Sequence, residues 1–300
     1  MTRVNNSPQP TQAILSSPET QSSYEGERVY FDAEPNRQPF PLYNQADYYS
    51  LTRNPRGVCM VISNEVFLGT GLTRQRGVQE DALHTVFTRL GFTVVIHKDL
   101  TAEAMQRELK ALGTRNFMND DALVVCILSH GEKGIVLGTD EQQVSLQELT
   151  RPFNSGQAPT LAEKPKLFFI ELCDGQAHFD HFVSGPGTGS LHHCNRQNSL
   201  EKDAGHIDET APWDLLLSTM LDCKPFQNTS TGSIYTQELC RQLTISAESS
   251  ENHDILTVLT RVNREVSKGE YMSHKKMPEY KCTLTKKLVL KFVQADCNQV

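Results

Sequence analysis

Short, uninterrupted apolar runs alternate along the middle of the chain with segments whose apolar residues recur at helical spacing. The runs 122–129 and 167–172 are too short for buried helices and too apolar for surface loops, so each predicts a buried parallel strand. Further strands are expected at 58–63, 93–96, 213–219 and 288–293. Helices are expected around the apolar stripes of 83–90, 105–112, 233–243 and 255–262. Strands that alternate with helices predict an α/β fold with a parallel sheet and right-handed crossovers.

Capping signals mark where several of these helices begin or end. Thr101 is expected to be the N-cap of the helix that carries the 105–112 stripe. Ser145, with Glu148 three residues later, predicts a capping box and a short helix before the second buried strand. Gly91 follows the 83–90 stripe directly, where a helix is expected to end.

The length of 300 residues is enough for one large core or two modest ones. Residues 1–45 are rich in Ser, Gln, Asn, Pro and Thr, so they bury too little apolar surface to offset their ordering entropy and are expected to be disordered. No run approaches the roughly 18 apolar residues that a membrane span requires, and the first residues lack the apolar stretch of a secretory signal. We therefore expect no membrane segment.

Charge and cysteine content narrow the function classes. The net charge of −7, without a long basic run, argues against nucleic-acid binding. The eight cysteines lie without paired spacing, which favours reduced thiols in the cytoplasm over a disulfide framework. The stretch 178–194 holds several histidines, but it lacks regular ligand spacing and lies in a Gly/Ser-rich loop. We expect neither a metal nor another cofactor.

Candidate chemistry lies at the ends of the two central strands. The run 167–172 ends at Cys173, and the run 122–129 ends at His130, which Gly131 follows. The carboxyl ends of parallel strands share one edge of a sheet, so the thiol and the imidazole are expected to meet there. This layout is typical of a cysteine hydrolase, in which the backbone amides of Gly131 and Cys173 hold the oxyanion.

Two segments carry a resemblance to a known family. Residues 128–134 and 164–170 resemble the histidine and cysteine segments of the caspases, and the likeness extends over roughly 48–293. The caspase cysteine signature is Gln-Ala-Cys-[Arg/Gln/Gly]-Gly, with the histidine about 50 residues upstream. This chain has Glu-Leu-Cys-Asp-Gly at 171–175, so only the cysteine and the last glycine match. The region 48–57 resembles the entry to the fold in insect executioner caspases.

The resemblance implies a three-layer sandwich of about six mostly parallel strands flanked by helices, with a two-fold dimer formed through the last strand. It also implies a zymogen divided into consecutive regions. These are a disordered prodomain (1–45), a large-subunit region (46–180), an inter-subunit linker (181–212), a small-subunit region (213–293) and a C-terminal tail (294–300). Processing is expected after Asp203, with Asp208 and Asp32 as further sites.

Caspases bind the aspartate at P1 with two arginines and the glutamine of the signature, and all three positions differ here. Counting back from Gly77, the first arginine is replaced by Gln75, although arginines flank it. Glu171 replaces the glutamine, Gln227 replaces the second arginine, and Phe226 is expected at S2. Removing one partner of a buried charge pair costs about 2–5 kcal/mol, so efficient cleavage after aspartate is not expected.

The resemblance assigns Cys173 as the nucleophile and His130 as the group that protonates the leaving amine. Asp174 either disfavours the thiolate or points into water. Two hypotheses follow. In one, a weakly active or inactive homologue in the apoptotic pathway regulates an active caspase by pairing with it. In the other, an active endopeptidase cleaves after a basic residue, or weakly after aspartate, with a protein or peptide as substrate.

Overall fold

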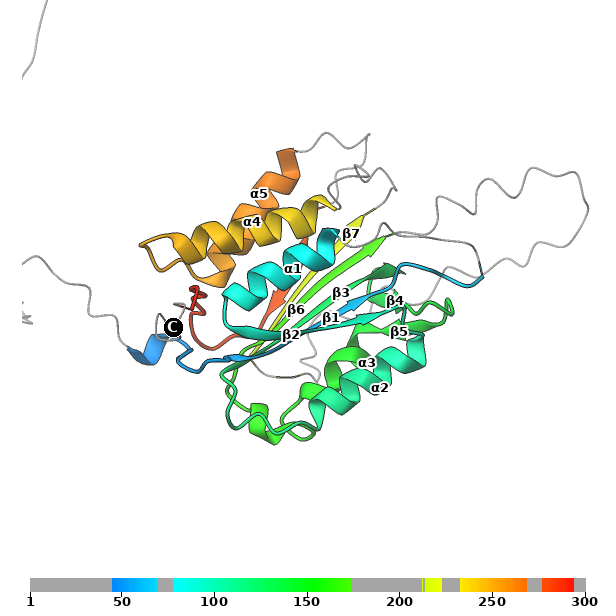
Figure 1. Ribbon diagram of the computed structural model, residues 1–300, viewed down its shortest axis with the longest axis horizontal. Helices are drawn as coiled ribbons and strands as arrows, with labels where there is room; N and C mark the ends of the chain where they lie inside the picture. The colour runs from blue at the N-terminus through cyan, green and yellow to red at the C-terminus, as the bar shows by residue number, and fades with distance from the viewer. Residues whose placement is uncertain are drawn as a thin grey trace, which may run out of the picture. The chain divides into compact units, whose positions relative to one another are not determined.

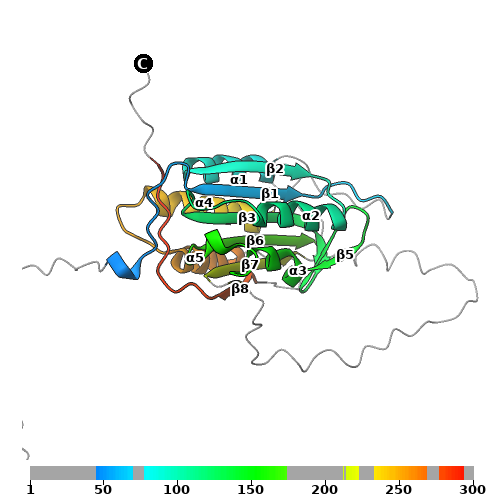
Figure 2. The same ribbon diagram turned by 90° about the horizontal axis from the view of Figure 1, so that it is seen from below.

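The computed structural model describes residues 45–69, 78–173, 212, 214–222, 233–268 and 277–293. These ranges are built on a sheet with the strand order β2-β1-β3-β6-β7-β8 (Figure 2). The strands are β1 (Gly57–Ser63), β2 (Phe92–Lys98), β3 (Ala122–Glu132), β6 (Lys166–Cys173), β7 (Leu215–Asp222) and β8 (Glu279–Cys282). Five of them are parallel and β8 is antiparallel to β7, which confirms the predicted sheet.

Helices cover both faces of this sheet (Figure 1). One face carries α1 (Val78–Arg89), α4 (Ile234–Glu248) and α5 (Ile255–Lys268), and the other carries α2 (Ala102–Gly113) and α3 (Leu146–Thr150). Short 3-10 turns occupy Gln45–Asp47, Arg151–Phe153 and Pro159–Leu161. Alternate residues of β3 pack into the two core layers, which confirms the three-layer α/β sandwich. No helix in the described ranges is long and apolar enough to cross a membrane.

The residues that the sequence predicted to begin or end helices do so in the structure. The Thr101 hydroxyl accepts a hydrogen bond from the Ala104 amide at 3.2 Å and caps α2. Ser145 and Glu148 form a complete capping box at α3. Gly91 has a φ of 87°, a left-handed conformation that glycine adopts without steric cost, so α1 ends there and the chain turns into β2.

Two features of the fold differ from the prediction. The expected strand at 288–293 is wrong, because the structure has only an isolated bridge between Val289 and Asp254 there. Leu288 and Leu290 are nevertheless buried in the core layer under α4 and α5, so the apolar alternation reflects an extended, core-facing segment. The edge strand is instead β8, and a small hairpin of β4 (Ile135–Leu137) and β5 (Gln143–Ser145) was not foreseen.

Candidate active site

The two predicted reactive side chains lie at neighbouring strand ends. Strands β3 and β6 pair in parallel, and their register places His130 opposite Cys173. His130 Nδ1 lies 3.1 Å from the Cys173 carbonyl oxygen. A carbonyl oxygen only accepts hydrogen bonds, so Nδ1 is the ring nitrogen that donates, and in the neutral ring Nε2 carries the basic lone pair. The structure brings these two residues together, and their catalytic roles stay a prediction.

Phe67 fixes the orientation of the histidine ring. Its ring stands edge-on to the imidazole, with the centroids 4.7 Å apart and the planes at 80°. Phe67 and His130 are both buried, whereas Cys173 is half-buried. An aromatic contact of this kind limits rotation of the imidazole. No pattern singled out Phe67, because it lies in an irregular segment after β1.

Gly131 has a structural reason to be a glycine. It pairs with Val136 of β4, and a Cβ atom built on it would come within 2.3 Å of the Ile135 carbonyl oxygen. The close approach of the β4 backbone therefore requires glycine at this position. The predicted contribution of the Gly131 amide to an oxyanion hole stays a prediction beside this packing requirement.

Glu171 is held inside the protein by two helices. It is 1% exposed, and its carboxylate accepts hydrogen bonds from Gln79 Nε2 at 3.0 and 3.2 Å and from Thr236 Oγ1 at 2.6 Å. Gln79 lies in the first turn of α1 and Thr236 in the first turn of α4. Helix N-termini carry partial positive charge, so both helices stabilise the buried carboxylate.

This arrangement explains what the sequence could not indicate. Gln79 and Thr236 are far from Glu171 in the chain, and each falls among ordinary helical residues. Only the packing of α1 and α4 on β6 brings their donors to the carboxylate. The structure therefore places Glu171 at a helix junction, two residues before Cys173.

Other thiols of the described core differ from Cys173 in burial. Burial and a neighbouring Cys59 raise the pKa of the Cys126 thiol well above its usual value. Burial also raises the pKa of Cys240 to about 12. A thiol with a raised pKa holds little thiolate at neutral pH and is a poor nucleophile. Cys173 is more exposed than either and lies at the sheet edge where open α/β proteins bind ligands.

Several predicted residues lie outside the described residues. They are Gln75, Phe226 and Gln227 of the expected substrate pocket, Asp174 after the nucleophile, and the expected processing sites Asp32, Asp203 and Asp208. Their roles stay predictions.

Comparison with known proteins adds to this geometry. Residues 56–289 match the family described as "Caspase domain". Caspase-8 of Rattus norvegicus is 33% identical over 270 residues, which are 85% of this chain and 55% of that protein. Caspase-7 of Gallus gallus is 34% identical over 229 residues, 73% of this chain and 69% of that protein. Caspase-1 of Drosophila melanogaster is 30% identical over 229 residues, 76% of this chain and 68% of that protein.

The chain spans about half the length of the caspase-8 relatives that it matches. The relatives include vertebrate and insect caspases, so the finer likeness to insect executioner caspases stays a prediction.

Proposed function

The chain belongs to the caspase family of cysteine peptidases, and on that premise we propose that it is a weakly active or inactive member that regulates an active caspase by pairing with it. In this proposal Cys173 and His130, which lie opposite each other on β6 and β3, act as the catalytic dyad. The thiolate attacks the scissile carbonyl, and the imidazole protonates the leaving amine. The impaired function is the recognition of aspartate at P1.

The buried carboxylate of Glu171 carries this proposal. It stands where the caspase signature has a glutamine, and it adds a negative charge two residues before the nucleophile. An aspartate side chain that enters nearby meets like charge. The replacement of two arginines by Gln75 and Gln227 removes charge-assisted hydrogen bonds as well. Each change weakens aspartate binding, and together they favour a regulatory role over efficient proteolysis.

The edge of the sheet supports pairing with a second caspase chain. Strand β8 pairs with β7 and is the last strand of the sheet within the described ranges. An edge strand presents backbone N–H and C=O groups that another chain can use. We propose that this edge contributes to a homodimer or a heterodimer, in the cytoplasm, and that the linker 181–212 is cut at Asp203 or Asp208.

Peptide-library cleavage tests the catalytic half of the proposal. We expect the wild-type chain to cleave after aspartate no more than slightly above the Cys173→Ala variant. The triple variant Gln75→Arg, Glu171→Gln, Gln227→Arg restores the family's residues, and we expect it to raise cleavage after aspartate by roughly 100-fold or more. Wild-type cleavage after aspartate at the rate of an active executioner caspase would refute the proposal.

Titration into an active caspase tests the regulatory half. The Cys173→Ala variant, which cannot contribute turnover, is added to a purified executioner caspase. We expect the turnover of that caspase to change in proportion to the complex measured by sedimentation. Failure to associate with any caspase tested would contradict pairing.

A second candidate function follows from the presence of both Cys173 and His130 in the sequence. An acid near the nucleophile is a feature of pockets that accept lysine or arginine at P1, and Glu171 is the acid present. The carboxylate is, however, already bonded to Gln79 and Thr236 in the structure, which favours the first function. The same peptide library decides, since turnover at a basic P1 that disappears in Cys173→Ala establishes the second function instead.

A further inference from the structure

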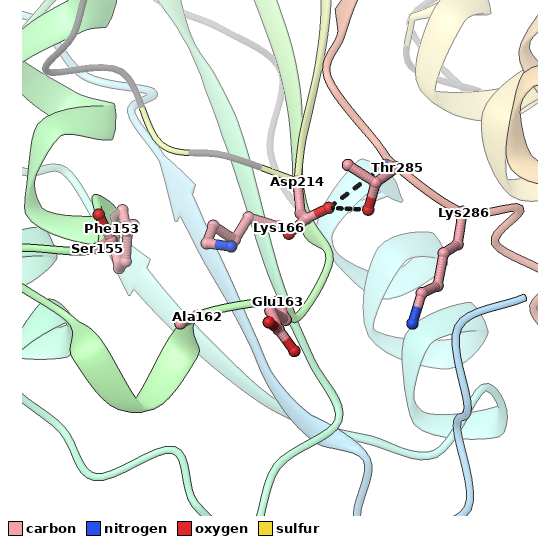
Figure 3. A pocket seen from close by; sticks show the side chains of 8 residues that line it. All are labelled: Phe153, Ser155, Ala162, Glu163, Lys166, Asp214, Thr285 and Lys286. Atoms are coloured by element: carbon pink, nitrogen blue, oxygen red, sulfur yellow. Dashed lines mark hydrogen bonds between the residues drawn. The ribbon is translucent and has the colours of Figure 1, made fainter. Parts of the chain in front are cut away.

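A cavity of about 530 Å³ opens at the amino ends of β6 and β7 (Figure 3). Its lining residues are Phe153, Ser155, Ala162, Glu163, Lys166, Asp214, Thr285 and Lys286. Lys166 begins β6 and Cys173 ends it, so at about 3.3 Å per residue the cavity lies roughly 23 Å from the candidate active site. This volume is within the range of pockets that hold small molecules. The dyad makes no use of this cavity.

The wall of the cavity contains a buried lysine. Lys166 is 2% exposed, and its ammonium group donates to the Lys164 carbonyl oxygen at 2.6 Å. Phe153 and Asp214 are also buried, whereas Glu163 and Lys286 are exposed. The cavity therefore combines a buried amine in its wall with exposed residues at its rim.

Two of the four non-glycine residues that have a left-handed backbone in the described ranges line the cavity. Glu163 has a φ of 60° and Asp214 a φ of 54°, and both line the cavity. Left-handed backbone is uncommon for residues other than glycine, and it concentrates at sites that hold ligands. Asp214 is fixed in this conformation by hydrogen bonds from the Tyr49 hydroxyl at 2.6 Å and the Thr285 hydroxyl at 2.7 Å. The surroundings hold the carboxylate rigidly beside the lysine.

Burial also changes the chemistry of the amine. Desolvation lowers the pKa of Lys166 to about 8, and the charge of Asp214 opposes this shift. The other charged groups that line the cavity are Glu163 and Lys286. At pH 7.4 about one fifth of such an amine is neutral, against about one in a thousand for an ordinary lysine. A neutral amine is a nucleophile and still has N–H groups to donate to Lys164.

The charges of the cavity indicate the class of ligand. Two lysines and two carboxylates line it, so it carries no excess positive charge that would attract an anion. Phe153 and Ala162 offer apolar contact. We propose that this cavity is a modification site at which Lys166 reacts reversibly with a small uncharged aldehyde.

The reaction is balanced without an oxidant or a reductant. The Lys166 Nζ lone pair forms a bond to the carbonyl carbon, and a proton passes from nitrogen to the carbonyl oxygen to give a carbinolamine. Loss of that hydroxyl and a second proton as water leaves a C=N double bond. Glu163 lines the same cavity, and a carboxylate is a suitable carrier for these protons.

The test uses the full chain with benzaldehyde as the probe and cyanoborohydride to trap the imine as a secondary amine. Peptide mass spectrometry then measures modification at each lysine from pH 6.5 to 10.5. At pH 7.4 we expect Lys166 to react on the order of tenfold faster than the rim residue Lys286, because far more of it is neutral. Its labelling rate is expected to reach half its maximum near pH 8.

The matched variants are Lys166→Met, which removes the amine, and Lys286→Arg, which leaves it in place. The fast phase should disappear in the first variant and persist in the second. The wild-type profile needs no variant and decides alone if Lys166→Met fails to fold. The proposal is overturned if Lys166 stays unmodified while exposed lysines react, if its rate rises only near pH 10.5, or if it reacts only in urea.

Discussion

Strand β6 buries an ionisable side chain near each end, and the groups that surround these two side chains differ. Glu171, near the carboxyl end, receives hydrogen bonds from Gln79 and Thr236 in the first turns of two helices. Lys166, at the amino end, donates a hydrogen bond to the Lys164 carbonyl oxygen, and Asp214 supplies the opposite charge. The carboxylate receives neutral hydrogen-bond donors from the first turns of two helices, whereas burial dominates at the lysine and lowers its pKa to about 8.

This contrast separates two uses of a buried charge. The carboxylate is tied to α1 and α4, so it links the strand that carries Cys173 to the helices that cover it. The amine lines a cavity and is partly neutral at physiological pH. One end of β6 therefore uses its charge to hold two helices, and the other places a buried amine in the wall of a cavity.

The largest expected effect comes from removing the acceptor at the carboxyl end. Glu171→Ala leaves the Gln79 amide and the Thr236 hydroxyl buried without their acceptor, and each such donor costs about 1–3 kcal/mol. We expect the free energy of unfolding in urea to fall by about 4 kcal/mol in total. Glu171→Gln keeps one acceptor oxygen and serves as the control, with a smaller loss. A loss below about 1 kcal/mol in the alanine variant would show that the carboxylate does not link the helices.

Removing the charge at the amino end is expected to have the opposite sign. The pKa of Lys166 is lowered on folding, so between about pH 8 and its ordinary value of 10.5 the unfolded chain binds more protons and stability rises with pH. Lys166→Met removes this cost, and below pH 8 we expect the variant to be more stable by up to about 3 kcal/mol.

That advantage should shrink as the pH rises from 8 to 10.5. Urea unfolding at pH 7 and pH 10 measures it, with Lys164→Met as the control for a neighbouring, less buried lysine. An advantage that is the same at both pH values would mean that packing, and not the charge, limits the stability of this end.

The fold was predictable because its signals are local and periodic. The apolar runs of β1, β3 and β6 and the caps at Thr101 and Ser145 follow from sequence spacing alone. The expected strand at 288–293 failed because alternation shows that Leu288 and Leu290 face the core but not whether the backbone pairs with a neighbour. Strand β8 was missed because its side chains are mostly exposed, so it has no apolar run.

The sequence could predict only the part of the candidate site that follows from the order and direction of the strands. The carboxyl ends of parallel strands share one edge of the sheet, so His130 and Cys173 could be placed near each other from the two runs, and the register confirms it. The partners of Glu171 come from helices separated from β6 by long stretches of chain, and no spacing rule connects them. The Lys166 cavity was invisible for the same reason, since its walls come from segments before β6, before β7 and after β8.

The smallest effect isolates a single bond at the carboxyl end. Thr236→Val keeps the shape of the side chain but removes the hydroxyl that donates to Glu171 at 2.6 Å, and we expect the unfolding free energy to fall by about 1–2 kcal/mol. Thr244→Val is the matched control on α4, because the Thr244 hydroxyl donates to the Cys240 carbonyl oxygen of the same helix. The unfolding free energy of Thr244→Val should fall by no more than about 0.5 kcal/mol. Equal losses in the two variants would mean that the Thr236 hydroxyl contributes nothing measurable to holding the Glu171 carboxylate.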